Sequence, residues 1–173
     1  MQTLPIFLTQ FVWFFIAWAL LAKYVAWPGT RELSINARLR FWIAPQMFRA
    51  LGLGLLVPQL SPGLAMSFAL PTALVDFFTA MLAVLAFIAL NRNSRLALPL
   101  TWACTIIGLG DLLIAFSIAP FIGVSDHLAA QWLIPAIVGP LMIVAHVACL
   151  ATLLESRSEL TTAASVRSRQ NAM

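Results

Sequence analysis

Charged side chains are scarce in this sequence. Only 9% of the 173 residues are Asp, Glu, Lys or Arg, whereas 62% are apolar. A soluble domain of this size carries about a quarter charged residues, so this composition cannot build a water-facing surface. The few charges also fall in short stretches between long apolar runs, which is typical of a protein embedded in a bilayer. Composition therefore excludes a separate soluble catalytic domain and predicts that the lipid bilayer is the chain's main partner.

Other absences narrow the function further. The net charge of +4 is spread over short basic segments with no basic face, so no nucleic-acid partner is predicted. The cysteines, Cys104 and Cys149, match neither a redox pair nor a zinc site. One histidine within an apolar run, His146, is too few for a di-haem cytochrome. We therefore assign no metal, no cofactor and no catalytic residue, and expect a role other than that of an enzyme.

What the sequence does contain is five apolar runs, each long enough to supply the roughly 20 residues that cross a hydrocarbon core. The first has no basic residue ahead of it and exceeds a signal-peptide core in length, so we expect a retained helix. The second is the shortest and carries Arg49. The predicted spans are Pro5–Ala26, Trp42–Leu60, Leu70–Leu90, Leu96–Ala119 and Ala130–Leu154.

Loop charges predict the orientation. The second and fourth loops, 61–69 and 120–129, contain no Lys or Arg, whereas the first loop, the third loop and the tail are basic. Because basic loops stay in the cytoplasm, five crossings place the N-terminus outside and the C-terminus in the cytoplasm. The fold class is thus an all-α polytopic membrane protein, in a cell membrane of the bacterial inner-membrane type. Residues 1–154 form one transmembrane domain, and the Ser-, Thr- and Arg-rich segment 155–173 is expected to be a disordered cytoplasmic tail.

Four ionisable residues fall within the predicted spans: Arg49, Asp76, Asp111 and His146. An ionisable side chain at membrane depth costs free energy, so each of the four is a candidate for binding or proton coupling. Side chains lean toward the N-terminus of their own helix, so Asp111 and His146 lean toward each other on neighbouring antiparallel spans. We therefore expect these two as a proton-exchanging pair, with Arg49 and Asp76 on either side of them.

The helical spacing supports one interior cluster, because each ionisable residue shares a face with small or polar residues, as closely packed membrane helices do. The first span has no such residue and is expected to pack outside the other four. The predicted faces are Gln46/Arg49/Gly52, Thr72/Asp76/Thr79/Ala83, Thr101/Cys104/Gly108/Asp111/Ala115 and Pro135/Gly139/Met142/His146/Cys149.

Structural explanations stay open for all four residues. Arg49 could extend to the headgroups, and Asp76 could reach the outer interface. Asp111 could be a neutral acid bonded to a backbone carbonyl, and His146 could be a packing residue. His127, in the outer loop, is expected to be solvated.

Three functions fit the sequence. The first is binding or proton-coupled transport of a small molecule through the polar cluster. The second is a non-catalytic accessory or assembly subunit of a larger membrane complex, with a membrane protein as partner. The third and weakest is an intramembrane lipid-modifying enzyme, for which no nucleophile or metal motif is present. We favour the first, because four buried ionisable residues exceed what packing alone requires.

Overall fold

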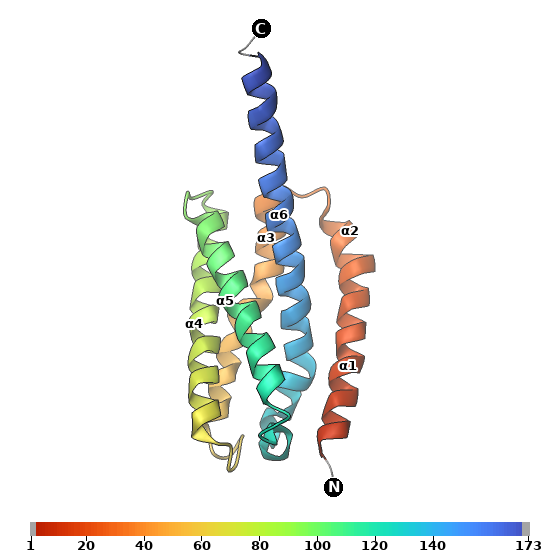
Figure 1. The fold of residues 1–173 in the computed structure, drawn as a ribbon, viewed down its shortest axis with the longest axis vertical. Coiled ribbons are helices and arrows are strands. Elements are labelled where there is room, and N and C mark those ends of the chain that lie inside the picture. The colour runs from red at the N-terminus through yellow and green to blue at the C-terminus, as the bar shows by residue number, and fades with distance from the viewer. Residues whose placement is uncertain (1–2, 171–173) are drawn as a thin grey trace.

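A computed structural model describes residues 3–170 of the chain, with side chains described as far as Ser156 (Figure 1). The described residues form helices and turns, with no strand among them. Four helical stretches are long and apolar enough to cross a membrane, as a multi-pass membrane protein requires. They are Thr3–Thr30, Met66–Asn91, Ala97–Ile118 and Ala130–Ser156.

The first stretch is built from α1 (Thr3–Leu21), the π-helical turn η1 (Ala22–Ala26) and α2 (Trp27–Thr30). It stands at the side of the bundle and packs mainly along α6 (Figure 1). Most of its side chains are exposed, and Trp13 is 70% exposed. The expectation that the first span lies outside the other helices agrees with this arrangement.

The second helical segment joins α3 (Ile35–Ile43) to η2 (Ala44–Leu56), a 3₁₀ helix. It begins at the same end of the bundle as α2 and runs to the opposite end, where α4 starts (Figure 1). The predicted span Trp42–Leu60 falls here and is not among the four apolar stretches. The structure also begins this helix at Ile35, seven residues before the predicted start of the span.

Two long helices and a broken one complete the bundle. Helix α4 (Met66–Asn91) and helix α5 (Ala97–Ile118) form an antiparallel pair. Two 3₁₀ turns, η3 (Val124–His127) and η4 (Ala130–Trp132), lead through the π-helical turn η5 (Ile134–Val138) into α6 (Gly139–Gln170). Pro135 lies within this π-helical turn and Pro140 lies two residues after it, as expected where proline removes backbone hydrogen bonds.

The interior of the bundle is filled by small side chains, and large apolar side chains cover its surface. A soluble protein has the reverse arrangement. The buried side chains of α4 are mainly alanines with Thr79, whereas its large apolar side chains, including Phe78 and Leu85, are exposed. Helix α5 likewise buries Thr101 and Cys104 and exposes Ile106. Close packing through small residues is how membrane helices associate, because lipid already solvates the large apolar side chains. The surface is therefore suited to hydrocarbon rather than water.

Among the residues whose side chains the structure describes, nearly all basic ones lie at one end of this bundle, where the loops before α3 and after α4 meet α6. We call this the charged end, and the opposite end the uncharged end. Arg38 binds Glu155 at 2.8 Å, Arg40 bonds to Asn91, and Asn36 donates to Asn93 at 2.7 Å. These contacts tie the start of α3 to the third loop and to α6. The predicted disordered tail, 155–173, overlaps the last part of α6, whose backbone is helical as far as Gln170. Residues 171–173 and the side chains after Ser156 lie outside the described part, so disorder of the tail stays a prediction.

Candidate functional site

Arg49, Asp76 and Asp111 meet in the interior of the bundle, and we call them the ion triad. Arg49 Nε donates to Asp76 Oδ1 at 2.7 Å, and Nη2 lies 2.5 Å from the same oxygen. Nη2 also binds Asp111 Oδ2. The remaining guanidinium nitrogen, Nη1, donates to the Gly108 carbonyl at 2.7 Å. Every nitrogen of Arg49 therefore has a partner within the protein.

The 3₁₀ conformation of η2 brings Arg49 to this position. A 3₁₀ helix has three residues per turn, so side chains three apart stand directly above one another. Gln46, Arg49 and Gly52 are the buried residues of η2, while Phe48 and Leu51 on the neighbouring line are exposed. The predicted face Gln46/Arg49/Gly52 is thus the buried one.

Helix geometry also places the three charges at one depth. With roughly 1.5 Å per residue in α-helix and 2.0 Å in 3₁₀, Arg49 lies roughly 25 Å from the start of α3. On the same scale Asp76 lies roughly 22 Å from the end of α4, and Asp111 roughly 21 Å from the start of α5. All three distances run from the charged end. The triad is therefore far too deep for Arg49 to extend to the headgroups at that end.

Glycines allow the close approach of the helices around the triad. A Cβ atom on Gly52 would lie within 2.8 Å of both Cβ and Cγ of Asp76. A Cβ atom on Gly108 would overlap His146 Nε2 and lie 2.7 Å from Thr79 Cγ2. The two Gly-Leu-Gly sequences, 52–54 and 108–110, therefore both contribute a contact glycine. They differ in conformation, since the first lies in a 3₁₀ helix and the second in an α-helix.

His146 does not pair with Asp111, contrary to the sequence prediction. Asp111 binds Arg49, and His146 lies one helical turn nearer the charged end, beside Gly108 and Thr79. The imidazole is 1% exposed, and its Nε2 has no hydrogen-bond partner among the described residues. The physical reason is that Arg49 reaches the depth of Asp111, because its helical segment begins at Ile35, seven residues before the predicted span. His127 lies in η3, outside the triad, with Nδ1 3.0 Å from the Pro62 carbonyl.

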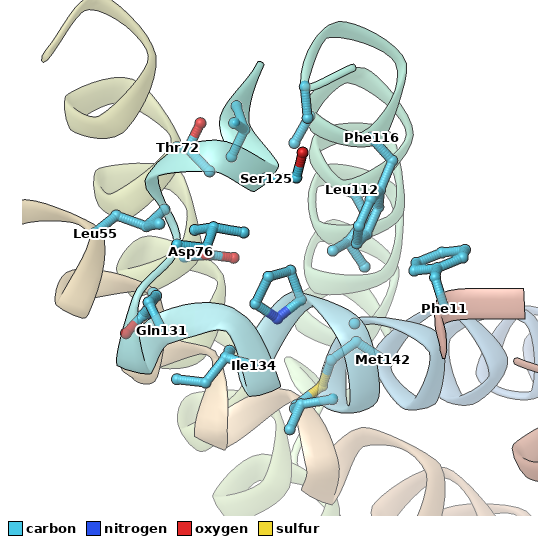
Figure 2. Close-up of a pocket in the computed structure, with 18 of the residues that line it drawn as sticks. Phe11, Leu55, Thr72, Asp76, Leu112, Phe116, Ser125, Gln131, Ile134 and Met142 are labelled. Carbon is cyan, nitrogen blue, oxygen red and sulfur yellow. The ribbon is translucent and has the colours of Figure 1, made fainter. Parts of the chain in front are cut away.

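A cavity of about 200 Å³ lies between the triad and the uncharged end of the bundle, and we call it the outer cavity. In Figure 2, Asp76 and Thr72 lie on one side of it, and Leu112 and Phe116 on the other. Helix α1 contributes Phe11 to the lining (Figure 2). The Asp76 and Asp111 side chains are 17% and 14% exposed, whereas the Arg49 side chain is only 2% exposed. Arg49 also contributes to the lining of the cavity, but the carboxylates are the more exposed part of the triad there.

Sequence reasoning did not find most of this lining. The aromatic residues of the cavity are five phenylalanines from four helical elements, and an apolar run gives no signal that one of its phenylalanines faces inward. Gln131 was also missed, although it is 3% exposed and its Nε2 donates to the Leu51 carbonyl at 3.0 Å. Its signal is a polar amide one turn before Pro135, inside a predicted span. The phenylalanines are Phe7, Phe11, Phe48, Phe68 and Phe116.

Comparison with known proteins adds a family but no activity. No curated protein and no solved structure matches the chain. A family model described as a domain of unknown function, DUF8737, matches residues 6–154. This range contains the whole ion triad and nearly all of the outer cavity. Because the match covers most of the sequence, the chain belongs to the DUF8737 family.

Proposed function

We propose that this protein binds a small molecule in the outer cavity and couples its binding or transport to protons at the ion triad. In this proposal the chain crosses the cytoplasmic membrane five times, with the N-terminus outside. The observation that carries the proposal is the position of two carboxylates, Asp76 and Asp111, at the base of a mostly apolar cavity. Ionisable groups at membrane depth are rare, and they commonly mark ligand or proton sites.

The geometry of α3 and η2 supports the fifth crossing. Nine α-helical and thirteen 3₁₀ residues extend roughly 40 Å, which exceeds the roughly 30 Å of a hydrocarbon core. The buried arginine of this segment is neutralised by carboxylates, so its charge does not face lipid. The basic residues at the charged end support a cytoplasmic location for that end.

The composition of the outer cavity supports ligand binding. Small-molecule sites are concave and mostly apolar, with a few polar groups that fix the orientation of the ligand. Here the polar groups are the ion triad, Thr72, Ser125 and Gln131, among leucines and phenylalanines. A cavity that served only packing would have no need of ionised groups at its base, since replacing buried ion pairs by apolar residues often stabilises a fold.

The charge balance of the triad supports proton coupling. Two carboxylates share one guanidinium, so the fully ionised triad carries one negative charge in an apolar setting. A buried unbalanced charge is costly, and a proton on one carboxyl removes it. Any ligand that stabilises the ionised triad therefore releases a proton, and one that needs the protonated triad takes one up. In this account His146 lies outside the exchanging group.

Proteoliposomes with an imposed pH gradient test the proposal. An internal pH dye reports collapse of the gradient when members of a panel of small organic solutes are added. We expect at least one solute to collapse the gradient faster than in protein-free vesicles, and Asp111→Asn to abolish this effect. Asp126→Asn, the same change in the exposed outer loop, is the control and should behave as wild type. Equal rates in wild type and Asp111→Asn for every active solute would contradict the proposal.

A second candidate function, that of an accessory subunit, is favoured by a separate observation. An apolar groove of about 660 Å³ runs between the first helical stretch and the α3–η2 segment, with Trp18 and Phe41 among its lining residues. A helix of a partner protein could lie in such a groove. Gentle purification distinguishes the two functions, because a stoichiometric partner is expected only for a subunit.

A further inference from the structure

The ion triad shows an uneven exposure to the outer cavity. Arg49 is buried beneath the two carboxylates, and its Nε, Nη1 and Nη2 all donate to protein acceptors. Arg49 uses Asp76 Oδ1 and Asp111 Oδ2. The other oxygen of each carboxylate has no hydrogen-bond donor among the described residues, and both side chains are partly exposed at the cavity. A ligand in the cavity therefore meets acceptor oxygens and a net negative charge.

The other walls complement the same kind of ligand. Five phenylalanines line the cavity, and Phe11 and Phe116 pack against each other at its α1 side with ring centroids 4.6 Å apart. The face of an aromatic ring carries partial negative charge and attracts cations, most strongly where water is absent. Aromatic rings and carboxylates together are a combination that favours an organic cation.

On these grounds we propose that the ligand of the outer cavity is a small organic cation with an apolar or aromatic body. This inference rests on the proposed function and names its substrate class. The cation would neutralise the surplus carboxylate of the ion triad, while its apolar body contacts the phenylalanines. An anion would meet the exposed carboxylates before it could reach Arg49. A neutral molecule would leave the surplus charge uncompensated.

The inference also sets the direction of coupling. A cation and a proton compensate the same negative charge, so the triad holds one or the other. Entry of one monovalent cation therefore releases one proton, which is an exchange of like charges. A cavity of about 200 Å³ is smaller than the roughly 300–1,000 Å³ of drug-sized sites, so a single-ring cation is the expected size.

A pair of isosteric probes tests this inference. Phenyltrimethylammonium carries a permanent positive charge, and tert-butylbenzene is its neutral counterpart of nearly the same shape. Binding of each to the full-length protein in nanodiscs is measured by equilibrium dialysis against empty nanodiscs of the same lipid. We expect saturable binding of the cation and an affinity for the neutral probe that is weaker by about tenfold or more.

Variants separate the charge from the cavity. Asp111→Asn should weaken binding of the cation by about tenfold or more and leave the neutral probe unchanged, while Asp126→Asn should change neither. Asp76→Asn serves the same purpose if Asp111→Asn does not fold. Saturable binding of the neutral probe at equal affinity would overturn the cation inference and leave the proposed site standing. Absence of saturable binding by either probe would overturn both.

Discussion

Gly52 and Asp76 lie so close together that no side chain fits between them. A Cβ atom on Gly52 would come within 2.8 Å of the Asp76 Cβ atom, so rotation of the carboxylate alone cannot relieve the contact. The absence of a side chain at Gly52 lets η2 approach α4 closely. That approach places Arg49, one 3₁₀ turn away, within bonding distance of Asp76.

Gly52→Ala is therefore expected to separate η2 from α4. The added methyl group must displace backbone or the Asp76 side chain, which should lower the free energy of unfolding by about 1–3 kcal/mol. Unfolding in mixed micelles by titration with a denaturing detergent measures the change. Gly110→Ala is the matched control, because a Cβ there meets nothing within 4 Å. Equal stability of the two variants would show that this close approach is not required.

Arg49→Met should destabilise the fold strongly, because it leaves two buried carboxylates without their cation. Breaking a buried ion pair from one side costs about 3–5 kcal/mol. The triple variant Arg49→Met/Asp76→Asn/Asp111→Asn removes the charges together and should recover part of that loss. The same detergent titration applied to both variants measures the coupling among the three residues. A triple variant less stable than Arg49→Met would contradict the assignment of the triad as one charge-compensated unit.

The sequence predicted which residues lie in the interior but not which of them form ion pairs with one another. Arg49, Asp76 and Asp111 were expected in the interior because each shares a helix face with small residues, and the structure buries those faces. The pairing depends on the depth of Arg49, which is set by the start of α3 at Ile35, and hydropathy does not reveal that start. Both helix types repeat every three to four residues, so Gln46, Arg49 and Gly52 share a face in either. What brings Arg49 to the depth of Asp111 is the start of its segment at Ile35, seven residues before the predicted start at Trp42.

The second span begins earlier than the sequence predicted. A count of apolar residues started it at Trp42, whereas the structure begins the helix at Ile35 and includes Arg38 and Arg40. Arg38 is buried all the same, because it lies over the Trp27 ring and binds Glu155. Such partners come from distant parts of the chain, and a window of neighbouring residues contains no information about them.

Cysteine accessibility tests the fifth crossing. Leu33 and Gln59 flank the α3–η2 segment and are both exposed. If the segment crosses the membrane, Gln59→Cys should react with an impermeant maleimide in intact cells, and Leu33→Cys should react only after the cells are opened. The native cysteines, Cys104 and Cys149, are buried and should stay unlabelled. Labelling of both introduced cysteines from the same side would mean that the segment does not cross.

Trp18→Phe should loosen α1 from the rest of the bundle. Trp18 Nε1 donates to the Ile137 carbonyl at 3.1 Å, where the π-helical turn η5 departs from regular α-helical hydrogen bonding. Loss of the bond should lower the free energy of unfolding by about 0.5–1.5 kcal/mol. Trp13→Phe changes an exposed tryptophan on the same helix and should have no effect. Thermal unfolding in detergent compares the two, and equal midpoints would rule out this anchoring role.

Carbodiimide labelling addresses the central claim, that carboxyl groups of the ion triad face an apolar cavity and exchange protons. Dicyclohexylcarbodiimide is apolar and reacts with protonated carboxyl groups, so it should modify Asp76 or Asp111 and spare the water-facing Asp126. Peptide mass spectrometry locates the adduct, and phenyltrimethylammonium should reduce its yield. Modification confined to Asp126 and other carboxylates outside the bundle, with none on either triad residue, would contradict the account.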